Sequence, residues 1–207
     1  MNRLIKKLVY TGIIEVKTGL HIGGTNAALN IGGPDNFVVR NPIDNKPYIP
    51  GSSLKGKMRS LTELYNGETN NGNPSNSAQS KSGALFGVSG SEKESHPSRL
   101  IVRDAELLNG DQLENTDLPY TESKTEASIN RITAKSIPRT FERVPAGAEF
   151  NLTMILNIFD SDNEEELKQT LKQAVSLLED DYLGGSGSRG YGHVIFRNWE
   201  EPEEKTY

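Results

Sequence analysis

The chain has 207 residues, 34% of them apolar and 25% charged, which is typical of one or two globular domains and excludes fibrous and fully disordered proteins. No apolar run approaches the roughly 20 residues of a membrane span. The N-terminal segment is charged and lacks the apolar core of a signal peptide, so we expect a cytoplasmic protein with no membrane partner. The absence of cysteine excludes disulfides, thiolate zinc sites, iron–sulfur clusters and a cysteine nucleophile.

The net charge of -5 and the pI near 5.3 argue mildly against a nucleic-acid partner. The charge is unevenly distributed, however, because residues 1–60 carry a formal +6 and residues 61–207 carry -11. Much of the acid lies in two runs, 160–166 and 200–204, which we interpret as solvated surface. Salt screens charges more than about 8 to 10 Å away, so a local basic face can still bind RNA.

Residues 8–17 alternate imperfectly between apolar and polar side chains, which predicts a half-buried strand, and a glycine-rich loop follows at 19–33. A short strand is expected at 37–39. Apolar residues then recur at helical spacing over 52–66, after two prolines that disfavour regular strand pairing, so we expect a helix there. Its candidate N-cap residues are Ser52 and Ser53.

The segment 66–82 is polar and of low complexity, and it predicts a mobile surface loop. Strands are expected at 99–108 and at 149–159, the second with clear two-residue alternation. Between them lies a polar excursion from about 117 to 145.

An amphipathic helix is expected at 164–179, with acids in its first turn where the helix dipole favours them, and a final strand at 191–199. The order strand, helix, strand, strand, helix, strand predicts an α+β, ferredoxin-like or RRM-like fold (βαββαβ) with long insertions. We expect a single domain spanning residues 1–207, and its open sheet is a familiar platform for RNA.

Two glycine motifs resemble nucleotide-binding loops but lack their context. Gly51–Lys57 fits G-x-x-x-x-G-K, yet Met58 stands where the magnesium-binding hydroxyl belongs. Gly185–Gly190 fits G-x-G-x-x-G, yet it follows a helix and precedes a strand, the reverse of the dinucleotide fingerprint. Both segments are dense in backbone N–H groups beside Lys or Arg, which suits an anion without requiring a nucleotide pocket.

Ser52, Lys55 and Arg59 share one polar stripe of the expected helix, which suits phosphodiester contact or an ordinary solvated face. Residues 184–192 hold five glycines, which indicates close approach of the backbone to a ligand or, alternatively, a tight turn. Within that loop, Arg189 is a candidate phosphate contact and Tyr191 a candidate stacking surface.

The three histidines are too far apart in sequence to predict a metal site. His21, flanked by glycines, is a candidate for RNA contact or for acid–base chemistry, whereas His96 is interpreted as a surface residue. Asp35 lies in a turn by composition, so it is either a turn former or a carboxylate that holds a divalent metal or orients a nucleophilic hydroxyl.

Several segments together resemble the RAMP superfamily, and more narrowly the repeated backbone subunit of the type III-A (Csm) CRISPR effector complex. The resemblance runs in order over about residues 7–197. Its most specific segment is PYIPGSSLKGKMRS at 47–60. The others are TGLHIGG (18–24), INRITA (129–134), PRTFERVPAGAEF (138–150) and the glycine loop.

This resemblance implies an RRM-like palm, a filament of several copies along one guide RNA with the other subunits of the complex, and a thumb hairpin from each copy. The thumbs are expected to interrupt the duplex between guide and target at regular intervals. Each copy is expected to cleave the complementary target RNA with a divalent metal (Mg or Mn) and an Asp in the loop after the first strand, a motif position that Asp35 occupies. The insert near 86–97 offers only His96 as a zinc ligand, so we expect no structural zinc.

The resemblance also implies which residues contact RNA. His21, Ser52, Lys55 and Arg59 match positions at the guide backbone, Gly185, Gly187 and Arg189 belong to the glycine loop, and Glu126, Arg131, Arg139 and Arg143 match the thumb and its base. Two alternatives stay open: a structural RNA-binding subunit whose Asp35 is inert, and a guide-processing endoribonuclease of the same superfamily that relies on His21.

Overall fold

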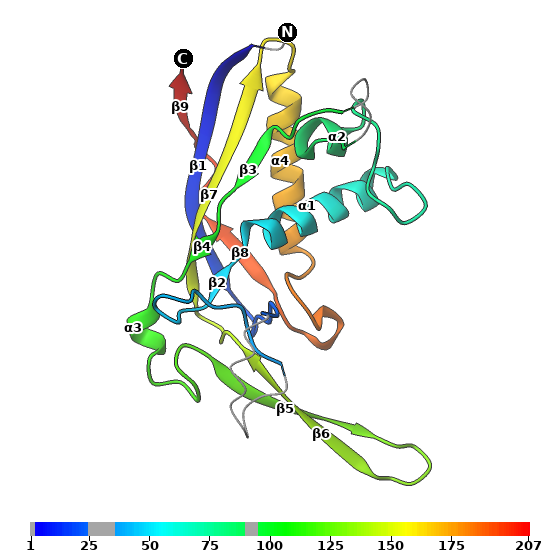
Figure 1. Ribbon diagram of the computed structural model, residues 1–207, viewed down its shortest axis with the longest axis vertical. Helices are drawn as coiled ribbons and strands as arrows, with labels where there is room; N and C mark the ends of the chain where they lie inside the picture. The colour runs from blue at the N-terminus through cyan, green and yellow to red at the C-terminus, as the bar shows by residue number, and fades with distance from the viewer. Residues whose placement is uncertain (1–2, 25–35, 90–94) are drawn as a thin grey trace.

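The computed structural model describes residues 3–24, 36–89 and 95–207, and it is built on one antiparallel sheet (Figure 1). The sheet order is β3-β7-β1-β8, and β9 also pairs with β1. The strands are β1 (Leu4–Val16), β3 (Leu100–Val102), β7 (Glu149–Phe159), β8 (Val194–Arg197) and β9 (Glu203–Thr206). This order places β3 and β7 side by side and β1 in the centre, which confirms the ferredoxin-like prediction.

Two long helices, α1 (Gly51–Asn66) and α4 (Glu164–Glu179), cover one face of the sheet together with the short α2 (Lys81–Phe86) (Figure 1). Leu54 and Met58 of α1 and Leu171 of α4 are buried in the same cluster as Tyr10 and Ile14 of β1. The apolar positions at helical spacing in α1 and α4 thus meet the alternating positions of the central strands, which fixes both helices on the palm.

The start of α1 differs from the sequence prediction. Neither Ser52 nor Ser53 is the N-cap, because the helix begins at Gly51 with Pro50 in the capping position and no side-chain cap. The carboxylate of Asp104 supplies the missing acceptor, since its Oδ1 lies 2.7 Å from the Gly51 amide nitrogen. A residue more than fifty positions away therefore performs the capping that a local serine was expected to perform.

That capping contact also interrupts the strand expected at 99–108. Regular pairing with β7 stops after Val102, and the chain forms β4 (Ala105–Glu106), which pairs with β2 (Tyr48–Ile49), before Leu107 bridges Phe150 of β7 again. The break lies where Asp104 turns toward α1. The short strand expected at 37–39 is likewise absent as a strand, and this segment makes only isolated bridges.

The end of the acidic tail forms a strand of the sheet, and its glutamate side chains are exposed, as expected. β9 pairs with residues 6–9 of β1, beyond the part of β1 that β8 covers. Lys6 Nζ lies 3.2 Å from a Glu204 carboxylate oxygen and 2.9 Å from one of Glu164, so the two acidic runs meet at one cation. The cation lowers the repulsion between them, which favours the pairing of β9.

The polar segment 66–82 is attached to the body at two points. Ser75 is buried, and its amide donates to Glu63 Oε1 at 3.0 Å. The carboxylate of Glu68 accepts from the amides of Lys81 and Ser82 at the start of α2. The mobility of this segment stays a prediction; the contacts hold its middle against α1 and join Glu68 to the start of α2.

A two-stranded hairpin, β5 (Glu122–Ile129) and β6 (Ser136–Arg143), projects from the palm (Figure 1). It lies within the polar excursion expected at 117–145, which also includes the end of the loop after α3 (Gly110–Leu113). In the described part of the chain, no helix is long and apolar enough to cross a membrane.

Candidate nucleic-acid interface

Three segments that are far apart in sequence meet at His21. Its carbonyl oxygen accepts from the Gly185 amide at 2.8 Å, so it holds the glycine loop. Its ring Nδ1 lies 2.6 Å from the Glu142 carbonyl oxygen, and its ring packs edge-on against Phe141 at the base of the hairpin. Because a carbonyl oxygen only accepts, Nδ1 is the donor in this hydrogen bond.

Glu142 anchors the base of the hairpin to the segment that follows the glycine-rich loop. Its carboxylate is 2% exposed. One oxygen accepts from Arg40 Nη2 at 2.5 Å and from Thr121 Oγ1 at 2.7 Å, and the other accepts from the Val38 amide at 2.9 Å. The backbone amide of Glu142 donates to the Asn36 carbonyl at 3.1 Å. Three of these four bonds join β6 to residues 36–40.

Asp35, the predicted catalytic and metal-binding residue, lies outside the described residues. The residues that flank this loop, up to Gly24 and from Asn36, are described and contact each other. The Gly24 amide donates to the Phe37 carbonyl at 3.0 Å, and the Val39 amide donates to the Ile22 carbonyl at 2.9 Å. The neighbour of Asp35 in sequence, Asn36, is therefore held next to the base of the hairpin and close to the His21 segment.

The polar stripe of α1 is largely engaged within the protein. Lys55 Nζ donates to Ser98 Oγ at 2.7 Å and to the Leu100 carbonyl at 2.9 Å. Burial, and next the charge of Arg59, lower the pKa of Lys55. Of the stripe, Ser52 is exposed. Lys55 thus serves the packing of α1 on β3, and its role at the guide RNA stays a prediction.

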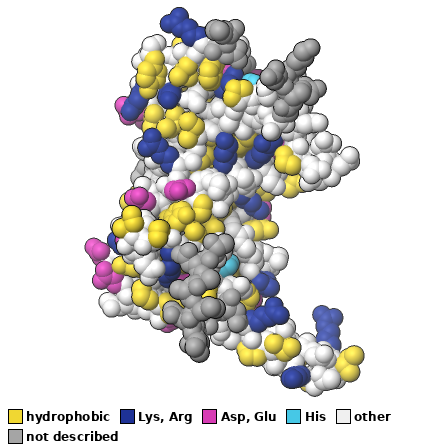
Figure 2. Space-filling view, in the orientation of Figure 1, with side chains coloured by type: hydrophobic (Ala, Val, Ile, Leu, Met, Phe, Trp, Pro, Cys, Tyr) yellow, Lys and Arg dark blue, Asp and Glu magenta, His cyan; other side chains and the backbone are white. Residues whose placement is uncertain are grey.

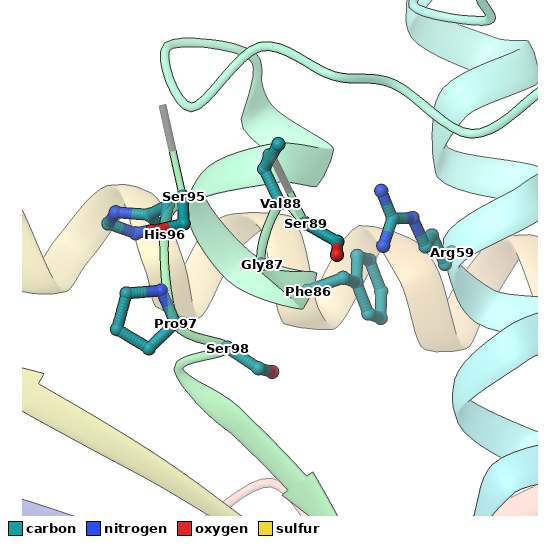
Figure 3. A pocket seen from close by; sticks show the side chains of 9 residues that line it. All are labelled: Arg59, Phe86, Gly87, Val88, Ser89, Ser95, His96, Pro97 and Ser98. Carbon is teal, nitrogen blue, oxygen red and sulfur yellow. The ribbon is translucent and has the colours of Figure 1, made fainter. Parts of the chain in front are cut away.

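Arg59 lines a hollow of about 510 Å³ beside α2 (Figure 3). Its Nε pairs with Glu63 at 2.7 Å and its Nη2 donates to the Ser75 carbonyl at 3.0 Å. Figure 3 shows Arg59 and His96 on opposite sides of this hollow. The buried carboxylate of Glu63 fixes the orientation of the Arg59 guanidinium. The remaining N–H groups of Arg59 are therefore held in one orientation at the hollow.

The glycine loop has internal reasons for its composition that the sequence did not reveal. A Cβ on Gly187 would lie 2.0 Å from the Tyr182 ring, so only glycine fits there. Lys57 of α1 lies 3.7 Å from the centroid of the same ring and 2.8 Å from the Asp181 carboxylate. Crowding against Tyr182 thus explains Gly187 without a ligand, and the RNA contacts predicted for Gly185 and Gly187 stay predictions.

Tyr191 is not a stacking surface, in contrast to the sequence interpretation. It is 1% exposed, and its hydroxyl donates to Glu126 Oε1 of β5 at 2.7 Å. Burial, followed by this hydrogen bond, raises the pKa of Tyr191 to about 12. Lys124 and Arg143 lie over its ring at 4.5 and 4.9 Å from the centroid. The tyrosine is therefore a link between the glycine loop and the hairpin.

The predicted arginines of the hairpin divide into two groups. Near the base, Arg143 Nε pairs with Glu122 at 2.5 Å, and Arg189 of the glycine loop pairs with Glu126 at 3.2 Å. Arg139, opposite Glu126 in the strand register, and Arg131, in the turn between the two strands, are exposed and have no ion-pair partner among the residues that the structure describes. Figure 2 shows Lys and Arg side chains on the projecting hairpin.

Sequence reasoning missed the residues that hold this interface together. Arg40, Lys57, Tyr182 and Glu142 make the linking contacts, and none was a candidate. Glu142 is the one buried residue of the otherwise exposed or half-exposed strand β6, and it gave no local sign of burial because its partners lie elsewhere in the chain.

A metal ion would find few protein ligands here. Among the described residues, no three His, Asp or Glu side chains lie together as a possible metal site. His96 pairs its backbone with Val88 at the edge of the hollow.

The comparisons with known proteins agree on one family. The model of the RAMP superfamily matches residues 13–195. The chain is 45% identical to the CRISPR system Cms endoribonuclease Csm3 of Streptococcus thermophilus, over 92% of this chain and 87% of the relative. It is 42% identical to the protein of the same name from Methanocaldococcus jannaschii, over 93% and 79% of the two chains.

Solved structures are similar over most of the fold. Csm3 in a Csm3–Csm4 subcomplex of the type III-A CRISPR-Cas interference complex matches with a TM-score of 0.61 and 33% identity, over 94% of this chain and 77% of that chain. The Methanopyrus kandleri Csm3 crystal structure matches with a TM-score of 0.61 at 23% identity, over 93% and 75% of the two chains. This second match supports the fold alone.

Proposed function

The chain belongs to the RAMP superfamily, and on this basis we propose that it is a guide-RNA-binding filament subunit of a type III-A CRISPR interference complex that cleaves complementary target RNA at regular intervals. Its relatives are named endoribonucleases and one structural relative was solved in a type III-A subcomplex. The partners are thus the guide RNA, the target RNA, further copies of the chain and the other subunits. We place this assembly in the cytoplasm.

One observation carries the proposal: two segments expected at the guide, His21 and the glycine loop, meet the base of the hairpin, and Asn36, the sequence neighbour of Asp35, is bonded to the same base. His21 contacts both the glycine loop and the residue Glu142, and Glu142 in turn contacts Asn36, next to Asp35. A hairpin that projects between paired bases would displace a nucleotide, and its base would then lie near the phosphate of that nucleotide.

The cleavage needs few protein groups. The 2′-hydroxyl of RNA is an internal nucleophile, and a displaced nucleotide can bring it in line with the phosphorus. Its oxygen loses a proton and bonds to phosphorus to form a 2′,3′-cyclic phosphate, while the bond from phosphorus to the 5′-oxygen of the next nucleotide breaks and that oxygen leaves as a hydroxyl after taking up a proton. In this proposal Asp35 orients the hydroxyl or binds a divalent cation, with the remaining ligands taken from RNA phosphates and water, as Mg²⁺ often does. The cation would neutralise charge that develops on the phosphate. His21 and the arginines near it bind and orient the strand.

The test replaces Asp35 in the assembled complex and follows target cleavage and guide content separately. Asp35→Ala should abolish the regular-interval products while the complex keeps its guide RNA. Asp44→Ala is the matched control, since Asp44 is an exposed carboxylate in the same basic third of the chain and accepts from the Lys46 amide. Unchanged cleavage by the Asp35→Ala complex would make the enzymatic assignment wrong and favour the structural subunit.

Three further measurements test the chemical mechanism and the choice between target cleavage and guide processing. A target with a single 2′-deoxy substitution at the scissile nucleotide should bind but stay uncut there; its cleavage would contradict the internal nucleophile. Metal titration should show cation-dependent cleavage with the RNA target present. If His21→Ala stopped guide maturation but not target cleavage, the guide-processing alternative would gain support over the present assignment.

A further inference from the structure

In the RNA-free chain, two glutamates of the hairpin form ion pairs with two arginines near its base. Glu122 lies directly across the hairpin from Arg143, and its Oε1 lies 2.5 Å from Arg143 Nε. Glu126 faces Arg139 in the strand register, but its carboxylate binds Arg189 of the glycine loop instead, at 3.2 Å from Nε. Arg143 and Arg189 are expected phosphate contacts, so a carboxylate lies where a phosphate oxygen would bind.

The carboxylates use the edge of each guanidinium that best fits a phosphate. Arg189 Nε pairs with Glu126, and Arg189 Nη2 donates to Ser186 Oγ at 2.5 Å. Both nitrogens on this edge of the guanidinium are therefore already engaged. The fork formed by Nε and Nη2 is the edge that binds an anion with two parallel hydrogen bonds. A phosphate must therefore either displace the carboxylate or accept a single hydrogen bond from one of the free N–H groups of the same arginine.

Glu126 is held in this position from its other side. The Tyr191 hydroxyl donates to its Oε1 at 2.7 Å, and Lys124 Nζ lies 3.4 Å from the same oxygen. The hydrogen bond from Tyr191 is the main cause of a lowered pKa of Glu126, opposed in part by burial. The carboxylate is thus ionised near neutral pH and does not release Arg189 by taking up a proton.

We propose that Glu122 and Glu126 determine RNA selectivity by competing with phosphates for Arg143 and Arg189. RNA bound only through its backbone gains little at these two arginines, because each phosphate must replace an existing ion pair. RNA that is also bound by the other protein contacts of the assembly has enough binding free energy to break these ion pairs. The inference rests on the proposed function, since it concerns how that same interface discriminates among RNAs.

The test measures affinity of the purified chain for a labelled oligouridylate, a probe with no sequence relation to a guide. The variant Glu122→Gln/Glu126→Gln keeps the size of both side chains and an acceptor for Tyr191, but it removes both charges. Affinity should rise about two- to fivefold for each Gln, in line with exposed ion pairs. The slope of log affinity against log salt should steepen by about 0.7 for each arginine that becomes available to single-stranded RNA.

Two matched variants keep the result specific. Glu201→Gln/Glu203→Gln removes the same charge at the acidic tail, where both side chains are exposed, and should change neither affinity nor slope. Adding Arg143→Met and Arg189→Met to the hairpin double variant should remove the whole gain. Thermal unfolding of each variant shows whether the fold is retained.

Three outcomes overturn the proposal: an unchanged or weaker affinity of the hairpin double variant, an equal gain in the tail variant, or a gain that survives loss of both arginines. These failures are distinct from failure of the proposed function. If the wild-type chain binds RNA with a steep salt dependence and the hairpin variant does not differ, only this inference fails. If the wild-type chain shows no salt-dependent RNA binding, the proposed function fails.

Discussion

Glu142→Ala should be one of the most damaging single substitutions in the chain. The carboxylate is the shared acceptor for Arg40, Thr121 and the Val38 amide, and it is 2% exposed. Its removal leaves a guanidinium whose side chain is only 11% exposed without a counter-charge. Breaking one partner of a buried ion pair costs about 3 to 5 kcal/mol, and the two other unsatisfied donors act in the same direction.

Urea unfolding followed by circular dichroism measures that cost, and amide exchange locates it. The Val38 amide should exchange faster in Glu142→Ala, because its acceptor is gone. The matched control is Glu122→Ala, whose side chain is 30% exposed and whose pair with Arg143 should contribute at most about 1 kcal/mol. A loss below about 1 kcal/mol for Glu142→Ala would refute the idea that this carboxylate joins the hairpin to the segment after Asp35.

Three other predictions follow from the fold. Gly56→Ala should stabilise the chain by about 1 kcal/mol in urea unfolding, because Gly56 is exposed inside α1 and a Cβ added there would meet no atom within 4 Å; a loss of stability would contradict this. Burial raises the pKa of Tyr10 and of Tyr191 to about 12 from 10.0, so the protonated forms favour folding below pH 10. The free energy of unfolding should then fall by roughly 1.4 kcal/mol per pH unit for each tyrosine between about pH 10 and 12. Tyr10→Phe should therefore halve the combined slope of the two tyrosines. Deleting residues 203–207 should speed amide exchange in residues 6–9, which pair with β9, and leave exchange at residues 13–16 unchanged.

The architecture was predictable because its main elements are encoded locally. The expected strand at 149–159 and the helix at 164–179 coincide with β7 and α4, since alternation and helical spacing of apolar residues are visible within each segment. Asn163 accepts from the Glu166 amide and caps α4, the kind of local signal that sequence alone can give. The hairpin at 122–143 was also anticipated as an excursion between two strands.

The sequence predicted several residues of the interface, but it did not predict which contacts these residues make with one another. His21 and the arginines of the hairpin were candidates, but Tyr191 was expected on the surface and is buried against Glu126. The glycines of the loop were interpreted as close approach of the backbone to a ligand or as a tight turn, and the collision of a Cβ on Gly187 with the Tyr182 ring was not foreseen. Neither fact is visible in a window of neighbouring residues.

Sequence by itself determined the order of the main palm elements and the position of a polar excursion at 117–145, since these depend on patterns within about ten to twenty residues; that the excursion is a hairpin was implied by the family resemblance. Tertiary structure alone decided how the interface is held: His21 meets Glu142 across 121 positions, and Arg40 meets Glu142 across 102. Such pairs have no local pattern because either partner, taken alone, is an ordinary polar residue. Only folding brings them into the low-dielectric contact that gives them their energy.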